Sequence, residues 1–576
     1  MPVSLAESRA GGGDWVALAR LLARPCISLL FAGLLPLLSP PSPAAAAQQL
    51  RLQLDGLQLP IDLPELEAWS RNPAAAKGEL AIWLNLLEPS SRLGLRRLLN
   101  APVIRDRSFG SQLLGSWSGD QMLKQLAELL ACGEGCNTDR LVLTTLKRLL
   151  QSQTSVSSIE LLRALPVERL TLDLDDLLAL ASQWRQQLQA QRQGFQRLQS
   201  LALPLRQYRP PLLPADAALL PRRLQLPVAH RKAPLPLELW PSANPQVGPW
   251  LLLMPGLGGD PEQLNWLAAA LAEQGWPVVL LEHPGSDSAA IQDSFAGKRP
   301  FPGAESLRDR LADVEAVLAA QRQGALGELG PGRAGSQGVV LMGHSLGGLV
   351  ALMAAGMPPE PGLASRCGRA LNHLPVINIS RLLQCQIPQL PAPGVASGAP
   401  PGEPPGLPAA ATATATASKV AAVPLARPAV IAVVVYNSFG SLLWPNAGLA
   451  PLKLPVLMVG GSLDLITPPI VEKLPAFLHS AHGRSRLVLV QGASHFSPVR
   501  LARDGKALFR LGDQLVGIEP LRVQSLLLNI TSEFLFSLAQ PLLLSPQLRQ
   551  QQGISAYVLD RQQAQLWWRR LNKPWP

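Results

Sequence analysis

The residues best suited to chemistry surround Ser345. This serine is the centre of a G-x-S-x-G pattern at 343–347, between an apolar run at 338–342 and a helix-forming segment at 349–355. The two glycines permit a turn so sharp that the serine hydroxyl is left open to a base and a substrate. The alternative is a serine in an ordinary strand-to-helix turn. We predict that Ser345 is a nucleophile.

A serine nucleophile needs a histidine to accept its proton and a carboxylate to orient that histidine. His495 follows an apolar strand predicted at 486–490, and Asp464 follows a strand that begins near 454. Asp464 is the only aspartate between Ser345 and His495. Because loops at the carboxyl ends of parallel strands meet at one edge of a sheet, we expect the three side chains to converge. The alternatives are a helix cap at Asp464 and an ordinary loop histidine at His495.

Other acids and histidines are less well placed for these two roles. Two glutamates lie in proline-rich loops and a third lies inside a predicted helix. One histidine lies in a predicted cap region, and two others precede the last strand instead of following it. These residues are Glu360, Glu403, Glu472, His373, His479 and His482.

The negative oxygen of an acyl-transfer intermediate needs two backbone N–H donors. One donor comes from the residue after the nucleophile, which is Leu346. The other comes from a loop after an earlier strand, and the glycine-rich loop at 255–259 follows the apolar run at 250–254. We predict Leu257 as the second donor, with Gly258 as the next candidate.

At these motifs the chain resembles the α/β-hydrolase superfamily, and more closely the cyanobacterial hydrolases that carry an N-terminal helical domain of unknown function. It is distantly similar to platelet-activating-factor acetylhydrolases and dienelactone-hydrolase-like esterases. The resemblance covers about 50–540. The matching segments lie at 255–259, 282–287, 343–348, 436–440, 461–464 and 492–496.

The resemblance implies an α/β-hydrolase fold, with a mostly parallel, doubly wound sheet preceded by an all-helical domain. It also implies hydrolysis of a small-molecule or lipid carboxylic ester by a serine esterase, without a cofactor. Two residues depart from the pattern: Pro255 stands where relatives carry histidine, and no acid follows the strand at 433–436. The same triad could serve a thioesterase or an acyltransferase, and a non-catalytic binding protein could keep the fold.

The N-terminus and the cysteines both point to export. Arg20 and Arg24 precede an apolar run at 27–38 and the small residues at 44–47, as in a secretory signal peptide. An uncleaved membrane anchor is the alternative. Four cysteines remain after 47, in the local pairs 132/136 and 367/385, which suit disulfides in a periplasmic or secreted protein. Neither a metal nor a cofactor is expected.

The charge pattern argues against a nucleic-acid partner. The formal net charge is +11, but only 16% of residues are charged and the arginines are scattered. The segment 565–573 mixes tryptophan and arginine, which permits a peripheral membrane contact. A terminal helix that packs its tryptophans on the core is the alternative.

Composition divides the chain into five parts. The helical part contains no group of acidic and basic residues suited to catalysis. We expect that it either covers the site or binds a protein partner that the sequence does not identify. The low-complexity stretch at 391–424 is expected to be disordered. The parts are a signal peptide at 1–47, a helical accessory domain at 48–200, a proline-rich linker at 201–221, a catalytic domain at 222–540 with an insertion at 357–428, and a C-terminal tail at 541–576.

Overall fold

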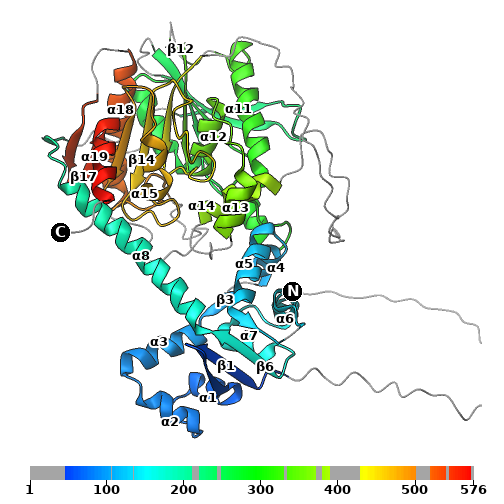
Figure 1. Cartoon of the computed structure of the whole chain (residues 1–576). Helices are drawn as coiled ribbons and strands as arrows, with labels where there is room; N and C mark the ends of the chain where they lie inside the picture. The colour runs from blue at the N-terminus through cyan, green and yellow to red at the C-terminus, as the bar shows by residue number, and fades with distance from the viewer. Residues whose placement is uncertain are drawn as a thin grey trace, which may run out of the picture. The chain divides into compact units, whose positions relative to one another are not determined.

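The structure is a computed structural model of the whole chain (Figure 1). It describes residues 46–104, 107–133, 135–209, 220–242, 248–327, 329, 334–371, 379–389, 429–500, 519–539 and 544–572. The predicted signal peptide up to residue 45, the low-complexity stretch at 391–424 and the last four residues lie outside the described residues. Within the described ranges, no helix has the length and apolarity needed to cross a membrane.

An 11-stranded sheet forms the centre of the larger domain, in the order β7-β16-β17-β15-β14-β13-β12-β10-β11-β9-β8. Six adjacent strands are parallel, and β8, β9 and β17 run antiparallel to their neighbours. The parallel strands are β11 (Val278–Leu281), β10 (Gly248–Met254), β12 (Ala334–His344), β13 (Val430–Tyr436), β14 (Val456–Gly461) and β15 (Arg486–Val490). The two edge strands are β7 (Leu205–Gln207) and β8 (Arg222–Leu226), and the others are β9 (Leu235–Trp240), β16 (Gln547–Gln551) and β17 (Ile554–Leu559). This is the predicted α/β-hydrolase fold.

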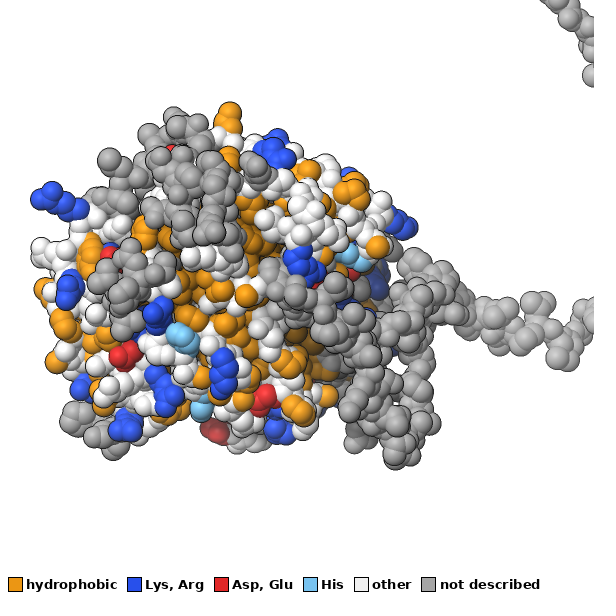
Figure 2. All heavy atoms as spheres, turned by 90° about the horizontal axis from the view of Figure 1, so that it is seen from above, with side chains coloured by type: hydrophobic (Ala, Val, Ile, Leu, Met, Phe, Trp, Pro, Cys, Tyr) orange, Lys and Arg blue, Asp and Glu red, His pale blue; other side chains and the backbone are white. Residues whose placement is uncertain are grey.

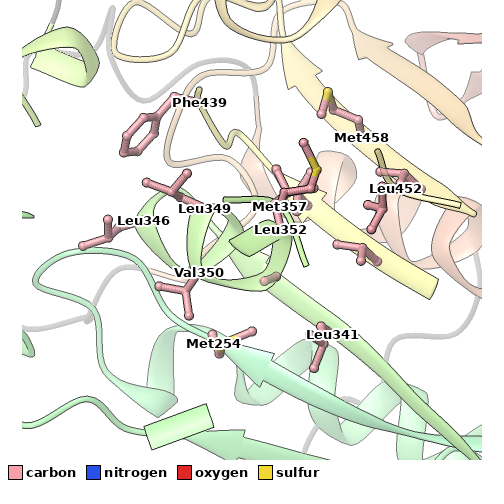
Figure 3. Close-up of a cluster of buried hydrophobic side chains, with 14 of the residues drawn as sticks. Met254, Leu341, Leu346, Leu349, Val350, Leu352, Met357, Phe439, Leu452 and Met458 are labelled. Atoms are coloured by element: carbon pink, nitrogen blue, oxygen red, sulfur yellow. The ribbon is translucent and has the colours of Figure 1, made fainter. Parts of the chain in front are cut away.

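Successive residues of the central strands face opposite layers of helices. In β12, Val339 and Leu341 join one buried cluster, whereas Val340 and Met342 join the other. Figure 3 shows part of the first cluster, where Leu341 and Met254 lie below side chains of the helix that follows Ser345. Both faces of the sheet are therefore covered, which explains the unbroken apolar runs of these strands. The covering helices are α9 (Asn265–Glu273) and α18 (Pro520–Ala539) on one face, and α11 (Leu307–Arg322), α12 (Leu346–Ala354) and α19 (Arg561–Leu571) on the other.

The N-terminal region has its own buried core, which includes Trp69, Val142 and Leu146. The predicted helices are present, but the region also contains a small four-stranded sheet in the order β2-β1-β6-β4. Asp62 caps the helix at 63–71, and Ser157 caps the helix at 158–164. The elements are β1 (Gln49–Leu54), β2 (Leu57–Asp62), α1 (Leu63–Arg71), α2 (Glu79–Leu86), α3 (Pro89–Leu99), β3 (Pro102–Ile104), α4 (Arg107–Leu114), α5 (Trp117–Leu129), β4 (Leu130–Ala131), α6 (Thr138–Ser152), β5 (Val156–Ser157), α7 (Ser158–Ala164) and β6 (Arg169–Asp173).

Two predicted boundaries are wrong because segments outside the predicted catalytic domain complete its sheet and core. Helix α8 (Leu174–Gln199) runs from the N-terminal region to the hydrolase domain (Figure 1), where Phe195 and Leu198 are part of the buried core. Strand β7, inside the predicted linker, pairs with β16. The predicted tail at 541–576 supplies β16, β17 and α19, and Trp567 is fully buried with its indole N–H donating to the Gly194 carbonyl at 2.8 Å.

The insertion after α12 includes α13 (Leu363–Leu371) and α14 (Ile379–Gln386), which a disulfide between Cys367 and Cys385 connects. The other expected pair, Cys132 and Cys136, is also disulfide-bonded. Helix α10 (Ser288–Phe295) and the short helices α15 (Pro469–Glu472) and α16 (Leu474–Phe477) complete the described hydrolase domain. On the face shown in Figure 2, basic side chains are dispersed around a central area of apolar side chains.

Candidate active site

Ser345 occupies a strained turn between β12 and α12. Its φ of +52° lies in the left-handed region, which is uncommon for a residue with a side chain. The flanking glycines are required by space: a Cβ on Gly343 would lie 2.3 Å from the Gly347 backbone, and a Cβ on Gly347 would lie 2.4 Å from the Met254 carbonyl oxygen. The local sequence therefore forms the strand–turn–helix arrangement that presents a serine hydroxyl at the edge of a sheet.

Asp464 and His495 meet at that same edge. The His495 Nδ1 lies 3.1 Å from Asp464 Oδ1, and both side chains are buried. The same carboxylate oxygen accepts hydrogen bonds from the backbone N–H groups of Ile466 (3.1 Å) and Thr467 (2.8 Å). Burial raises the pKa of Asp464, but the charges of His495 and Lys473 and the side-chain hydrogen bonds from His495 and Thr467 outweigh it and hold the pKa below its usual range. The carboxylate is thus ionised and able to orient the imidazole.

The backbone carbonyl of His495 is hydrogen-bonded to the residue that precedes the nucleophile. The Nε2 of His344, the residue before Ser345, lies 2.9 Å from the His495 carbonyl oxygen, and the two rings are 4.9 Å apart between centroids. The side-chain amide of Asn437 donates to the same carbonyl at 2.9 Å. Burial lowers the pKa of His344 to about 3, so its imidazole is neutral and can donate through Nε2. These contacts bring the loop of the base to the turn that carries Ser345.

A buried lysine supports the acid. Lys473 is fully buried, and its Nζ donates to the Thr467 carbonyl at 2.7 Å and lies 3.7 Å from Asp464 Oδ2. Burial lowers the pKa of Lys473, and the Asp464 carboxylate opposes this change. Because a lone buried charge is costly, a cation beside the acid reduces the cost of keeping Asp464 ionised.

The two predicted loop donors of the oxyanion hole differ in their contacts. Gly258 is wrong as a donor, because its N–H donates to the Ser286 carbonyl at 2.8 Å. The Leu257 N–H has no hydrogen-bond partner among the described residues. A Cβ on Gly256 would lie 3.1 Å from Ser345 Cβ, so this loop approaches the nucleophile closely. Leu346 is the first residue of α12, where the helix leaves N–H groups without internal partners.

The remaining titratable residues have other contacts. The buried Glu472 carboxylate binds Ser380, the backbone N–H groups of Gly440 and Ser441, and Gln384. Glu360 accepts hydrogen bonds from Asn446 and Ala447, whereas His479 and His482 contact backbone groups of their own segments. Glu403 and His373 lie outside the described residues. In the part of the chain that the structure describes, no three His, Cys, Asp or Glu side chains form a group suited to a metal ion.

Three supporting residues were not predicted as part of the site. Asn437 lies in the segment 436–440, which carries part of the family resemblance, and its position at the end of a parallel strand could have indicated a role. His344 is the variable residue inside the G-x-S-x-G pattern. Lys473 gave no sequence signal, because a lysine between two short helices is ordinarily exposed.

Comparison with known families agrees with this fold. Residues 251–505 match the model of the alpha/beta hydrolase family, and residues 46–173 match that of an alpha/beta hydrolase of unknown function (DUF1400). No curated protein matches the chain significantly. The two family matches and the sheet topology together show that the chain has an α/β-hydrolase fold. The second match ends at Asp173, where α8 begins.

Proposed function

We propose that the protein is an exported serine hydrolase that cleaves carboxylic esters through Ser345, His495 and Asp464. The observation that carries the proposal is the His495–Asp464 contact of 3.1 Å beside the strained turn at Ser345. Membership of a largely hydrolytic family supports the general reaction type.

In the proposed reaction, His495 Nε2 takes the proton of the Ser345 hydroxyl as the serine oxygen attacks the ester carbonyl carbon. The Leu346 and Leu257 N–H groups stabilise the negative oxygen of the tetrahedral intermediate. His495 then gives its proton to the departing alcohol, which leaves an acyl group on Ser345. Water, deprotonated by His495, attacks this acyl group, and His495 returns the proton to the Ser345 oxygen as the carboxylic acid leaves.

The two disulfides support export, because such bonds persist in oxidising compartments. The substrate we propose is a small or lipid-like acyl ester, and peripheral contact with a membrane belongs to this same proposal. A protein partner of the N-terminal region is a further proposal.

The test is hydrolysis of p-nitrophenyl esters of short and long acyl chains by the wild type and three variants. Ser345→Ala and His495→Ala should lower kcat by about 10⁴-fold or more, and Asp464→Asn should lower it by a similar order. His479→Ala, which removes an exposed histidine, is the matched control and should leave kcat unchanged. Near-normal hydrolysis by Ser345→Ala would refute the proposal. Faster turnover of thioesters would instead indicate a thioesterase that uses the same triad. Acyl transfer to an added alcohol would indicate an acyltransferase.

A further inference from the structure

Arg310, on α11, is a fully buried arginine beneath the loop at 255–259, which we call the oxyanion loop. Its neighbours on the same helix, Leu307 and Val314, belong to the hydrophobic core. A guanidinium group is costly in such surroundings unless its donors are satisfied. Its hydrogen bonds should therefore be specific and rigid.

Among the described residues, the hydrogen bonds of Arg310 end on two loops, at 255–256 and at Ser286. Nη1 donates to the Pro255 carbonyl at 2.8 Å, and Nη2 donates to the Gly256 carbonyl at 2.9 Å. Nε donates to the Ser286 hydroxyl at 2.8 Å, and Nη2 also contacts the Ser286 carbonyl at 3.1 Å. Burial lowers the pKa of Arg310 to about 9, while Asp313 opposes this change, so the group is a cation at neutral pH.

These bonds determine the direction of the Leu257 N–H. The Gly256 carbonyl and the Leu257 N–H belong to one planar trans peptide and point in opposite directions. Because Arg310 binds the carbonyl, the N–H must point away from Arg310. The Ser286 carbonyl, which the same guanidinium contacts, also accepts the Gly258 N–H. Arg310 therefore binds the carbonyl groups of two consecutive peptide units of the oxyanion loop, 255–256 and 256–257.

We propose that Arg310 is a positioning residue that sets the oxyanion hole by fixing the 256–257 peptide with its N–H free for the reacting oxygen. This inference rests on the proposed function, because it concerns the same intermediate. Without Arg310, the Gly256 carbonyl would lose its donor and the peptide could rotate. The hole would then be incomplete although Ser345, His495 and Asp464 were unchanged.

Asp313, one helical turn further along α11, supports the same arrangement. Its carboxylate binds Arg231 Nη2 at 2.6 Å and His283 Nδ1 at 2.8 Å. Arg231 Nη1 in turn donates to the Pro284 carbonyl at 2.8 Å. Asp313 thus holds the loop at 283–286, which presents Ser286 to Arg310.

The test combines ester hydrolysis with binding of an alkyl boronic acid, which forms a tetrahedral adduct on a serine nucleophile and places an oxygen in the oxyanion hole. Arg310→Lys keeps a charge but loses the planar fork. We expect kcat to fall about 10- to 100-fold with little change in KM, and the boronic acid to bind more weakly by a similar factor. The control is Arg549→Lys, a buried arginine on β16 paired with Glu533, which should leave both quantities unchanged.

The outcomes separate this inference from the proposed function. A folded wild type that hydrolyses no ester and binds no boronic acid would reject the proposed function itself. An active wild type, with a folded Arg310→Lys variant of unchanged kcat and boronic-acid affinity, would reject only the role of Arg310. If Arg310→Lys does not fold, Ser286→Ala decides, because it removes only the hydroxyl that binds Nε. A fall of about 3- to 10-fold in both quantities would support the inference, and no change in either would overturn it.

Discussion

At the scale of single residues, the site depends on buried charges that are each matched by a partner. Asp464 has Lys473 and His495, and Asp313 has Arg231 and His283. Burial first raises the pKa of Asp313, but His283 and Arg231 together lower it to about 2. The carboxylates that orient other groups therefore stay ionised over the working pH range.

Glu282, close to the oxyanion loop, shows the opposite behaviour. Burial raises its pKa from 4.5 to about 7, and the carboxylates of Asp287 and Asp260 add to the effect. The folded protein therefore binds more protons than the unfolded chain between these values, so ionisation of Glu282 lowers stability as the pH rises toward 7.

Glu282→Gln should accordingly raise the free energy of unfolding by about 1 kcal/mol near pH 8, a figure reduced for solvent screening, and by less near pH 5. Urea unfolding of wild type and variant at both pH values measures this. The control Glu262→Gln reports the effect of losing an exposed carboxylate from the same region. An equal gain at both pH values for Glu282→Gln would contradict the raised pKa.

The main chemical residues could be predicted from sequence, whereas their supports could not. Ser345, Asp464 and His495 each follow a strongly apolar strand, and parallel strands bring such loops to one edge. Arg310 binds backbone carbonyls of a segment distant in sequence, and Lys473 binds the carbonyl of Thr467, six positions before it. Carbonyl groups are the same at every position, so a residue that binds them leaves no pattern to detect.

At the scale of elements, α8 connects the N-terminal region to the loop of the catalytic acid. The Gln191 side-chain amide, which is buried, donates to the Ser462 carbonyl at 2.6 Å and lies 3.4 Å from the Asp464 carbonyl. A helix that begins at the N-terminal sheet therefore contacts the turn that presents Asp464.

Gln191→Ala should leave these carbonyls without their donor and loosen the acid loop. We expect a loss of about 1–3 kcal/mol in unfolding free energy and a severalfold fall in kcat. Gln186→Ala on the same helix is the control, because Gln186 is exposed and its amide donates to Ser182 one turn earlier. The role of α8 in holding the acid would be refuted if the two variants had the same kcat.

Strand β16 was not predicted because its buried positions are polar. In β16 the inward residues are Gln547, Arg549 and Gln551, so the strand lacks the apolar alternation that marks a sheet. Arg549 is matched by Glu533, and Gln551 donates to Ser525. By contrast, β1 has alternating leucines that are typical of a strand. The prediction of a purely helical region therefore missed a pattern that the sequence contains.

At the scale of the whole molecule, the boundary between the two regions falls within α8 and not at its end. Phe195 and Leu198 belong to the hydrolase core, and Trp567 donates its indole N–H to the Gly194 carbonyl. The family match to the N-terminal region also ends at Asp173. The second half of α8 is therefore part of the hydrolase domain.

Two truncated chains test this boundary. A chain of residues 174–576 keeps α8 and should be soluble and retain ester hydrolysis. A chain of residues 201–576 loses two core side chains and uncovers Trp567, a loss of about 5 kcal/mol or more, comparable with the stability of a whole domain. Soluble yield, thermal unfolding and hydrolysis report the difference. Equal stability of the two chains would show that α8 is dispensable to the hydrolase core.

The central claim is that Ser345 is an activated nucleophile. The most direct measurement is treatment of the full-length protein with a fluorophosphonate probe, followed by mass spectrometry of its peptides. We predict a single phosphonyl adduct on Ser345 of the wild type, no adduct on Ser345→Ala, and much slower labelling of His495→Ala. Labelling at another residue, or no labelling of a folded wild type, would contradict the account.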